Sequence, residues 1–313
     1  MNYTSQKSLT YNPSLTRNIG NKALTIISSL FAIISVLPLI LVISYVLIKG
    51  GSYINLDTLI LEPEPPGDDL LSAGGLGPAI TGTFIMAAIA SIISIPVGVG
   101  GGIYLAEYSK SGNFAKFIRF GSNVLAGVPS IIAGVFIYAI IVSTKILFGS
   151  MFSGIAGGIS LSILMLPTII KTTDEALKLV PNDMRRAAFG IGASKFTMIT
   201  NITLPAAFGS ISTGVLLAIA RAAGETAPLI FTALFSRYFI TSFDDLFYEM
   251  GWLSVLIYNF ALEPYEVQNQ LAWAASFILV VVLLSLNILS RWIGTLGAFS
   301  KNKVWLWSKL IIK

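Results

Sequence analysis

The sequence contains neither cysteine nor histidine, and only 11% of its 313 residues carry a charged side chain. Without cysteine there is no disulfide framework and no thiol nucleophile. Without either residue there is no zinc site of the usual kind and no imidazole proton relay. Soluble domains have about 25% charged residues, so a soluble fold is excluded. Because 55% of the residues are apolar, intrinsic disorder is excluded too, and an integral membrane protein remains.

Six long runs of the chain contain no charged residue. Each exceeds the ~20 residues with which a helix crosses ~30 Å of hydrocarbon, and their continuous apolar pattern predicts helices rather than a barrel. The first run is too long for a signal peptide, and Lys49-Gly50-Gly51 follows it instead of a cleavage site, so we interpret it as a retained helix. We therefore expect an all-α integral membrane protein with six spans at about residues 23–48, 78–106, 120–144, 146–170, 205–235 and 267–290.

The segments between the runs alternate in charge. With the N-terminus in the cytoplasm, 16 of the 20 basic residues fall on the inner side and 10 of the 15 acidic residues on the outer side. This positive-inside pattern predicts a multi-pass protein of the cell (inner or plasma) membrane with both termini in the cytoplasm. The net charge of +5 then reflects topology, and we expect lipid rather than nucleic acid as a partner.

The polar segments complete the expected organisation. The loop 50–77 is rich in proline, glycine and acids, which predicts an irregular external connection. The aromatic segment Trp252–Tyr258 is too short to span and is expected to lie at the interface or dip into the bundle. We expect a cytoplasmic tail over 1–22, a transmembrane domain over 23–295 that contains a cytoplasmic coupling segment over 171–204, and a cytoplasmic tail over 296–313.

Two short helices are predicted in the segment 171–204. The sequence Thr172-Thr173-Asp174-Glu175 fits a capping box that opens the first helix, and Pro181 ends it. Asn182 or Asp183 is expected to cap the second helix.

Glycine and proline are frequent within the runs. Small residues let helices approach closely, which is the ordinary explanation for the glycines. Together with the prolines they also suit broken or kinked helices that line a path through the membrane, as in transporters. The prolines within or at the ends of runs are Pro38, Pro96, Pro129, Pro167, Pro205 and Pro228.

A charged pair interrupts the fifth predicted span. Arg221 and Glu225 are four residues apart, so on a helix they lie on one face and can pair. A charge at mid-bilayer costs roughly 2.5–3.5 kcal/mol on insertion scales and rarely persists without a role. One interpretation is a neutralising pair that locks helices together. The other is a substrate path through Arg221, Glu225 and Thr226, in which the guanidinium binds phosphate or carboxylate through two hydrogen bonds and Glu225 holds it while the path is empty.

The segment 186–205 has a distinctive spacing. It has Arg186-Ala187-Ala188, three residues, Gly192, nine residues, and Ile202-Thr203-Leu204-Pro205. This resembles the EAA loop of bacterial ABC importer permeases, with Arg186 in place of the usual Glu. A salt bridge made by that Glu is then absent, moved to Asp183, or reversed in polarity. The resemblance implies that an ATPase docks here, on Asp183, Arg186, Ala187, Ala188, Gly192, Ala193 and Pro205.

Further segments are similar to the phosphate-specific permeases of this family: Gly102–Tyr108, Leu125–Gly134, Ala220–Ala233 and Gln270–Ala274. The similarity covers most of residues 20–295. It implies the MetI-like bundle of type I importers and a pore formed with a second permease subunit. It also implies an ATPase dimer inside, which binds ATP and Mg, and a periplasmic phosphate-binding protein outside.

Several activities are excluded by missing motifs. The sequence has no Gly-x-x-x-x-Gly-Lys-Ser/Thr, hence no P-loop, and no hydrolytic constellation. We therefore expect no catalysis and no metal or cofactor in this chain, which would be the membrane subunit of an ATP-driven importer of inorganic phosphate. An importer of sulfate or molybdate, an ATP-independent anion transporter or channel, and an added role in signalling phosphate supply stay open.

Overall fold

The computed structural model describes residues 15–67, 74–109, 112–145 and 152–311, and side chains from 16 to 293. The described residues form helices and no strand; an isolated bridge joins Pro63 and Gly74. This confirms the all-α fold class. The elements are α1 (Leu15–Gly51), α2 (Leu56–Ile60), α3 (Gly77–Ile103), η1 (Tyr104–Tyr108), α4 (Asn113–Gly127), α5 (Ser130–Ile137), η2 (Tyr138–Val142), α6 (Gly154–Lys178), α7 (Asn182–Gly190), α8 (Lys195–Met198), η3 (Ile199–Thr203), α9 (Leu204–Ala223), α10 (Ala227–Thr232), η4 (Asp244–Phe247), α11 (Leu253–Ala261) and α12 (Glu266–Ile311).

The segment up to Ile48 is a structural unit of its own. It contains most of α1, whose apolar side chains are largely exposed: Phe31 is 65% exposed and Leu41 is 59% exposed. A helix that is apolar on all sides is suited to lipid rather than water. The predicted tail over 1–22 needs a correction, because α1 already begins at Leu15; residues 1–14 lie outside the described part.

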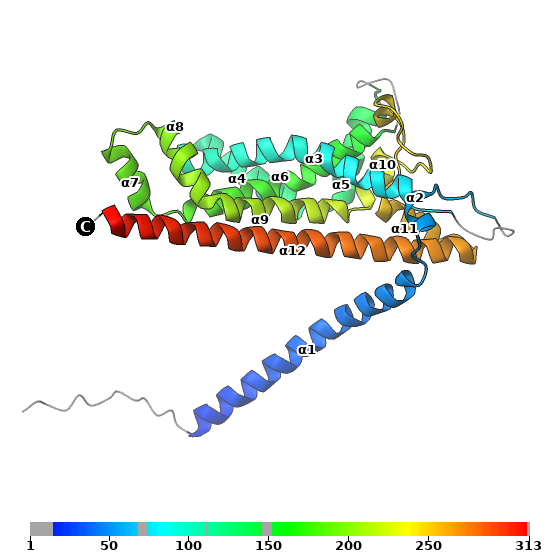
Figure 1. Ribbon diagram of the computed structural model, residues 1–313, viewed down its shortest axis with the longest axis horizontal. Coiled ribbons are helices and arrows are strands. Elements are labelled where there is room, and N and C mark those ends of the chain that lie inside the picture. The colour runs from blue at the N-terminus through cyan, green and yellow to red at the C-terminus, as the bar shows by residue number, and fades with distance from the viewer. Residues whose placement is uncertain (1–14, 68–73, 110–111, 146–151, 312–313) are drawn as a thin grey trace, which may run out of the picture. The chain divides into compact units, whose positions relative to one another are not determined.

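The unit from Lys49 onward is a helix bundle (Figure 1). Helix α6 packs against α3 and α9, and α9 packs along α12. Small residues permit this approach: a Cβ on Gly102 of α3 would overlap Thr173 of α6, and one on Gly214 of α9 would overlap Thr172. Helices α7 and α8 lie at one end of the bundle, and α2, α10 and α11 lie towards the other.

Among the described residues, five helices are long and apolar enough to cross a membrane, and a bent pair of helices brings the number to the expected six if it counts as one crossing. This pair is formed by α4 and α5, which are bent by 106°. The bend falls at Pro129, which has no N–H for a continuing helix. The other five long apolar stretches are Thr16–Gly51, Gly77–Tyr108, Gly154–Lys178, Lys195–Ala223 and Glu266–Ile293.

The predicted capping box at Thr172 is wrong. Helix α6 continues through this residue to Lys178, and the Thr172 hydroxyl donates to the Thr168 carbonyl one turn earlier. Close packing of α6 on Gly214 keeps this turn inside the bundle. The second predicted helix exists as α7, but no side chain caps it, and its N-cap residue is Pro181 rather than Asn182 or Asp183.

Two further segments are more helical than expected. Helix α12 runs to Ile311, so most of the predicted tail over 296–313 is helical. The segment 50–77, predicted as an irregular external connection, contains α2, which is capped by the Asn55 side chain accepting from the Thr58 N–H at 2.7 Å.

The predicted aromatic segment dips into the bundle. Trp252, Leu253 and Leu256 are fully buried at the start of α11. Before it, the backbone N–H groups of Ser242 and Thr241 donate to the Asp245 carboxylate and hold its pKa below the usual value. The segment therefore enters the core from an ordered loop.

Candidate functional site

The fifth predicted span is broken at the charged pair. Helix α9 ends at Ala223, Gly224 is its C-cap, and Thr226 is the N-cap of the short helix α10. Pro228 lies in the first turn of α10, where a missing N–H costs nothing. The expectation that one helix continues to residue 235 and carries both charges is therefore wrong, because Glu225 lies in the break.

The break is held in place by α11 and the residue before it. The Glu225 carbonyl accepts hydrogen bonds from Trp252 Nε1 at 3.1 Å and from Ser254 Oγ at 2.6 Å. Both donors belong to nearly or fully buried residues. A helix end inside a membrane leaves backbone carbonyls without partners, and these two donors satisfy one of them.

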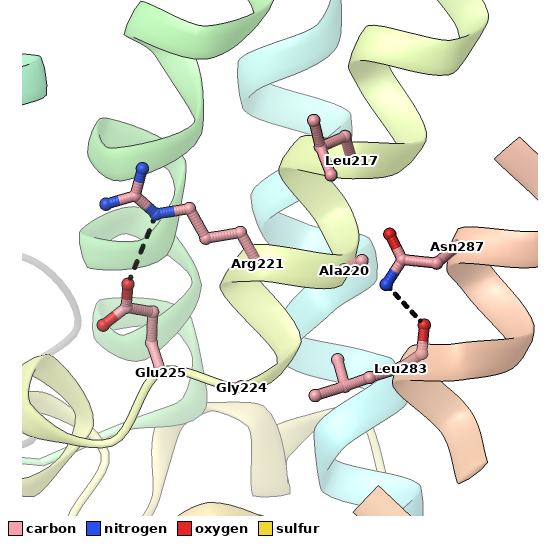
Figure 2. A pocket seen from close by; sticks show the side chains of 7 residues that line it. All are labelled: Leu217, Ala220, Arg221, Gly224, Glu225, Leu283 and Asn287. Atoms are coloured by element: carbon pink, nitrogen blue, oxygen red, sulfur yellow. Dashed lines mark hydrogen bonds and ion pairs between the residues drawn. The ribbon is translucent and has the colours of Figure 1, made fainter. Parts of the chain in front are cut away.

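Arg221 and Glu225 form a loose ion pair (Figure 2). The Arg221 Nε lies 3.8 Å from Glu225 Oε1, which is beyond hydrogen-bonding distance. The Arg221 side chain is 63% exposed and that of Glu225 is 17% exposed. An exposed pair of this length contributes little to stability.

A cavity of about 400 Å³ lies beside this pair, between α9 and α12. At about 30 Å³ per molecule it has room for roughly a dozen waters, or for a small oxyanion and part of its hydration shell. Asn287 of α12 also lines the cavity, and its Nδ2 donates to the Leu283 carbonyl; in Figure 2 the Arg221 side chain points away from Asn287. The lining residues are Leu217, Ala220, Arg221, Gly224, Glu225, Leu283 and Asn287.

The predicted ATPase-docking residues other than Pro205 lie together on α7 and the turn after it. Gly192 has φ +82°, its N–H donates to the Phe189 carbonyl, and the Ala193 N–H donates to the Ala188 carbonyl. These two bonds form a Schellman motif, which ends a helix sharply and favours glycine. Ala188 is buried against Met198, and Ala187 is exposed.

Asp183 and Arg186 are exposed on α7. Among the described residues neither takes part in an ion pair within 4.0 Å. Within the described part of the chain, Asp183 therefore makes no salt bridge that replaces the one of the usual Glu.

Pro205 lies apart from the other docking residues, in the first turn of α9. The helical stretch itself begins earlier, at Lys195, and passes through the π-helical turn η3 just before the proline. A widened turn accommodates a residue that lacks an N–H. The span therefore starts ten residues before the predicted start at Pro205.

A buried ion pair was missed by the sequence reasoning. Glu107 of η1 and Arg185 of α7 approach to 2.7 Å, with side chains 4% and 13% exposed. The available signal was Glu107 itself, the acid that ends the second uncharged run. Its partner lies 78 residues further along the chain, and no pattern of spacing links the two.

Solved structures with a similar fold come from ABC transporters. A chain of the MetNI methionine transporter in an inward-facing conformation has a TM-score of 0.54 and 17% identity, covering 71% of this chain and 94% of that one. A chain of a bacterial importer of the polysaccharide alginate has a TM-score of 0.54 and 15% identity, covering 88% and 96%. At these identities the likeness establishes the fold, that of ABC importer permeases.

Residues 98–296 match the family of binding-protein-dependent transport system inner membrane components, so the chain is a multi-pass membrane component of such a system. Phosphate transport system permease protein PstA of Yersinia pestis is 39% identical over 287 residues, 92% of each chain. The PstA protein of Pasteurella multocida is 38% identical, covering 88% of this chain and 94% of that one. The PstA protein of Mycobacterium leprae is 34% identical, covering 88% of each chain. The chain belongs to this family, among the PstA permeases.

Proposed function

We propose that this chain is the permease subunit of an ATP-driven importer of inorganic phosphate and lines half of its translocation path. The observation that carries the proposal is the exposed side chain of Arg221, one of the residues that line the cavity between α9 and α12. The relatives are named as permeases of phosphate transport systems, which favours phosphate over sulfate or molybdate.

Arg221 has the chemistry that an oxyanion requires. A guanidinium offers two parallel N–H donors to phosphate, and a Glu225 carboxylate 3.8 Å away leaves those donors open to an anion. In the empty path Glu225 holds the arginine near the cavity. When phosphate is bound, the carboxylate repels it and keeps the site weak enough for release. Thr226 adds a hydroxyl donor at the break.

The other parts of the importer are separate chains. We assign the end with α7 and α8 to the cytoplasm, together with both termini, as the charge pattern of the sequence favours. An ATPase dimer, which binds ATP and Mg, docks on α7 and the Gly192 turn. A second permease subunit completes the path, and a periplasmic phosphate-binding protein delivers the anion. This chain itself is non-catalytic and binds no cofactor.

The proposal is tested by uptake of radioactive phosphate into vesicles that contain the complete complex. We expect uptake to require ATP, the ATPase and the external binding protein. Unlabelled phosphate should compete with the label, whereas equal concentrations of sulfate or molybdate should not. Competition by sulfate would overturn the assignment of phosphate, and uptake by this chain alone would overturn the ATP-driven mechanism.

Large apolar side chains are exposed around α7, where the ATPase is proposed to dock. Ile191 is 85% exposed and Phe196 is 69% exposed. Burial of one such side chain contributes about 1.5–3 kcal/mol. We therefore expect Ile191→Asp to lower the amount of ATPase that copurifies with the permease by about tenfold or more, because a charge replaces the buried group.

Phe243→Asp is the matched control for this experiment. Phe243 is 80% exposed and precedes η4, in the loop between α10 and α11. Copurification of the ATPase should be unchanged in this variant. Equal losses in both variants would point to a folding defect, and no loss in Ile191→Asp would move the docking surface elsewhere.

A further inference from the structure

The turn η1 at the end of α3 has no role in the function proposed above. It is a π-helical turn, closed by a hydrogen bond from the Ser109 N–H to the Tyr104 carbonyl at 3.0 Å. Such turns are rare and occur frequently at functional sites. This turn contains Glu107, whose side chain is 4% exposed. A buried carboxylate is costly unless it is paired, so its partner is informative.

That partner, Arg185, joins three segments. Its Nη2 and Nε donate to Glu107 Oε1 at 2.7 and 3.1 Å. Its Nη2 also donates to the Leu177 carbonyl of α6 at 2.7 Å, and its Nη1 to the Val180 carbonyl just beyond α6 at 2.6 Å. The guanidinium is therefore fixed in one geometry, and it connects α7 to η1 and to the end of α6.

A second contact reaches η1 from the other side of the Gly192 turn. The Lys195 ammonium, at the start of α8, lies 4.6 Å from the centre of the Tyr108 ring, in cation–π distance. Helices α7 and α8 flank the turn that is proposed to dock the ATPase. Both of them hold η1, through adjacent residues.

The opposite end of α3 reaches the candidate site. The Leu253 N–H donates to Thr83 Oγ1 at 3.1 Å, and Thr83 is 1% exposed. The neighbouring Trp252 donates to the Glu225 carbonyl. Along its length, α3 shares a buried apolar cluster with α6 and α9. Helix α3 is thus a continuous element with a specific polar contact at each end.

We infer that η1 carries movement of the ATPase-docking turn to α3, and that Glu107 and Arg185 are the positioning pair that makes this link. The inference rests on the proposed function. Displacement of α7 moves Glu107 because the pair has one bonded geometry. Helix α3 then shifts as a unit, and the contact of Thr83 with Leu253 passes the shift to the segment that fixes Glu225.

The test uses Glu107→Gln and Arg185→Gln in the complete complex in vesicles. The measured quantity is the number of phosphate ions imported per ATP hydrolysed. We expect each variant to lower this ratio about fivefold or more while ATP hydrolysis continues, because the ATPase still docks. The double variant should be no worse than either single one, since both remove the same link. Unchanged ratios in both single variants would overturn the inference.

Lys178→Gln is the matched control. Lys178 Nζ lies 2.6 Å from Asp174 Oδ2 within α6, so this variant also removes an ion pair, but it leaves in place the pair of Glu107 and Arg185 and the hydrogen bond from Arg119 to the Leu105 carbonyl of η1. The number of phosphate ions that the Lys178→Gln complex imports per ATP, and its thermal unfolding temperature, should equal those of the unmodified complex. If all variants lose transport in proportion to thermal stability, the pair of Glu107 and Arg185 is structural only and the inference fails.

A second readout does not depend on phosphate. The chain has no cysteine, so spin labels attached to introduced cysteines mark only the chosen positions of this chain. The chosen variants are Phe84→Cys on α3 and Leu284→Cys on α12, where the natural side chains are 55% and 43% exposed. We expect a non-hydrolysable ATP analogue to change the distance between the labels, and no change in the Glu107→Gln background. A distance change in a complex that imports no phosphate would overturn the proposed substrate and support the link. A change that persists with Glu107→Gln would overturn the link.

Discussion

Replacing Arg221 by alanine is expected to reduce phosphate uptake by about 10- to 100-fold, because a hydrogen bond to a charged group contributes about 1.5–3 kcal/mol. Arg221→Lys should retain part of the activity, since lysine keeps the charge but loses the planar pair of donors. The measurement is the initial rate of ATP-dependent uptake by the complete complex. Normal uptake in both variants would remove Arg221 from the path.

The same variants distinguish a substrate path through Arg221 from the alternative, in which the ion pair of Arg221 and Glu225 only locks helices together. The pair is 3.8 Å long and Arg221 is 63% exposed, so its loss should leave the thermal unfolding temperature unchanged. Arg291→Ala, an exposed arginine of α12 away from the cavity, is the control for loss of a positive charge and should leave uptake unchanged. A fall in unfolding temperature that matches the fall in uptake would favour the lock.

The membrane fold could be predicted because charge is excluded from hydrocarbon, so the positions of a few side chains delimit the spans. The Gly192 turn could be predicted because an αL helix end selects for glycine locally. The break after α9 could be predicted only in general terms, because Gly224 and Pro228 suit a broken or kinked helix but do not fix where it ends. The position of the break is decided by two hydrogen-bond donors, Trp252 and Ser254, which bond the Glu225 carbonyl from nearly 30 residues away in the sequence.

Tertiary packing also overrode a valid local signal at Thr172. The residues Thr172 to Glu175 satisfy the pattern of a capping box, but the side chain of Thr172 lies against Gly214 of α9 inside the bundle. The ion pair of Glu107 and Arg185 was missed for a related reason, since only the fold brings η1 to α7. Candidate residues could thus be predicted where a charge stands out within an apolar run, as at Arg221 and Glu225. They were missed where the interaction joins residues distant in sequence, as for Glu107 and Arg185.

Replacing Gly134 by valine is expected to destabilise the bundle and impair uptake together. A Cβ on Gly134 of α5 would lie 2.5 Å from the Cα, 2.8 Å from the carbonyl oxygen and 3.0 Å from the carbonyl carbon of Pro228 in α10. All three are backbone atoms, so no side-chain rotation relieves the overlap. Such overpacking costs about 1–3 kcal/mol, and we expect a fall of several degrees in the thermal unfolding temperature of the purified permease.

The displacement should reach the candidate site because Pro228 lies in the first turn of α10, three residues after Glu225. Gly121→Ala is the control: Gly121 lies within α4, and a Cβ at this position would have no described atom within 4 Å other than those of its chain neighbours and its own helical backbone. Alanine favours a helix over glycine by about 0.8–1.0 kcal/mol, so this variant should unfold at an equal or slightly higher temperature. Equal unfolding temperatures for both variants would show that α5 and α10 can separate without cost, and the contact would then not hold the break in place.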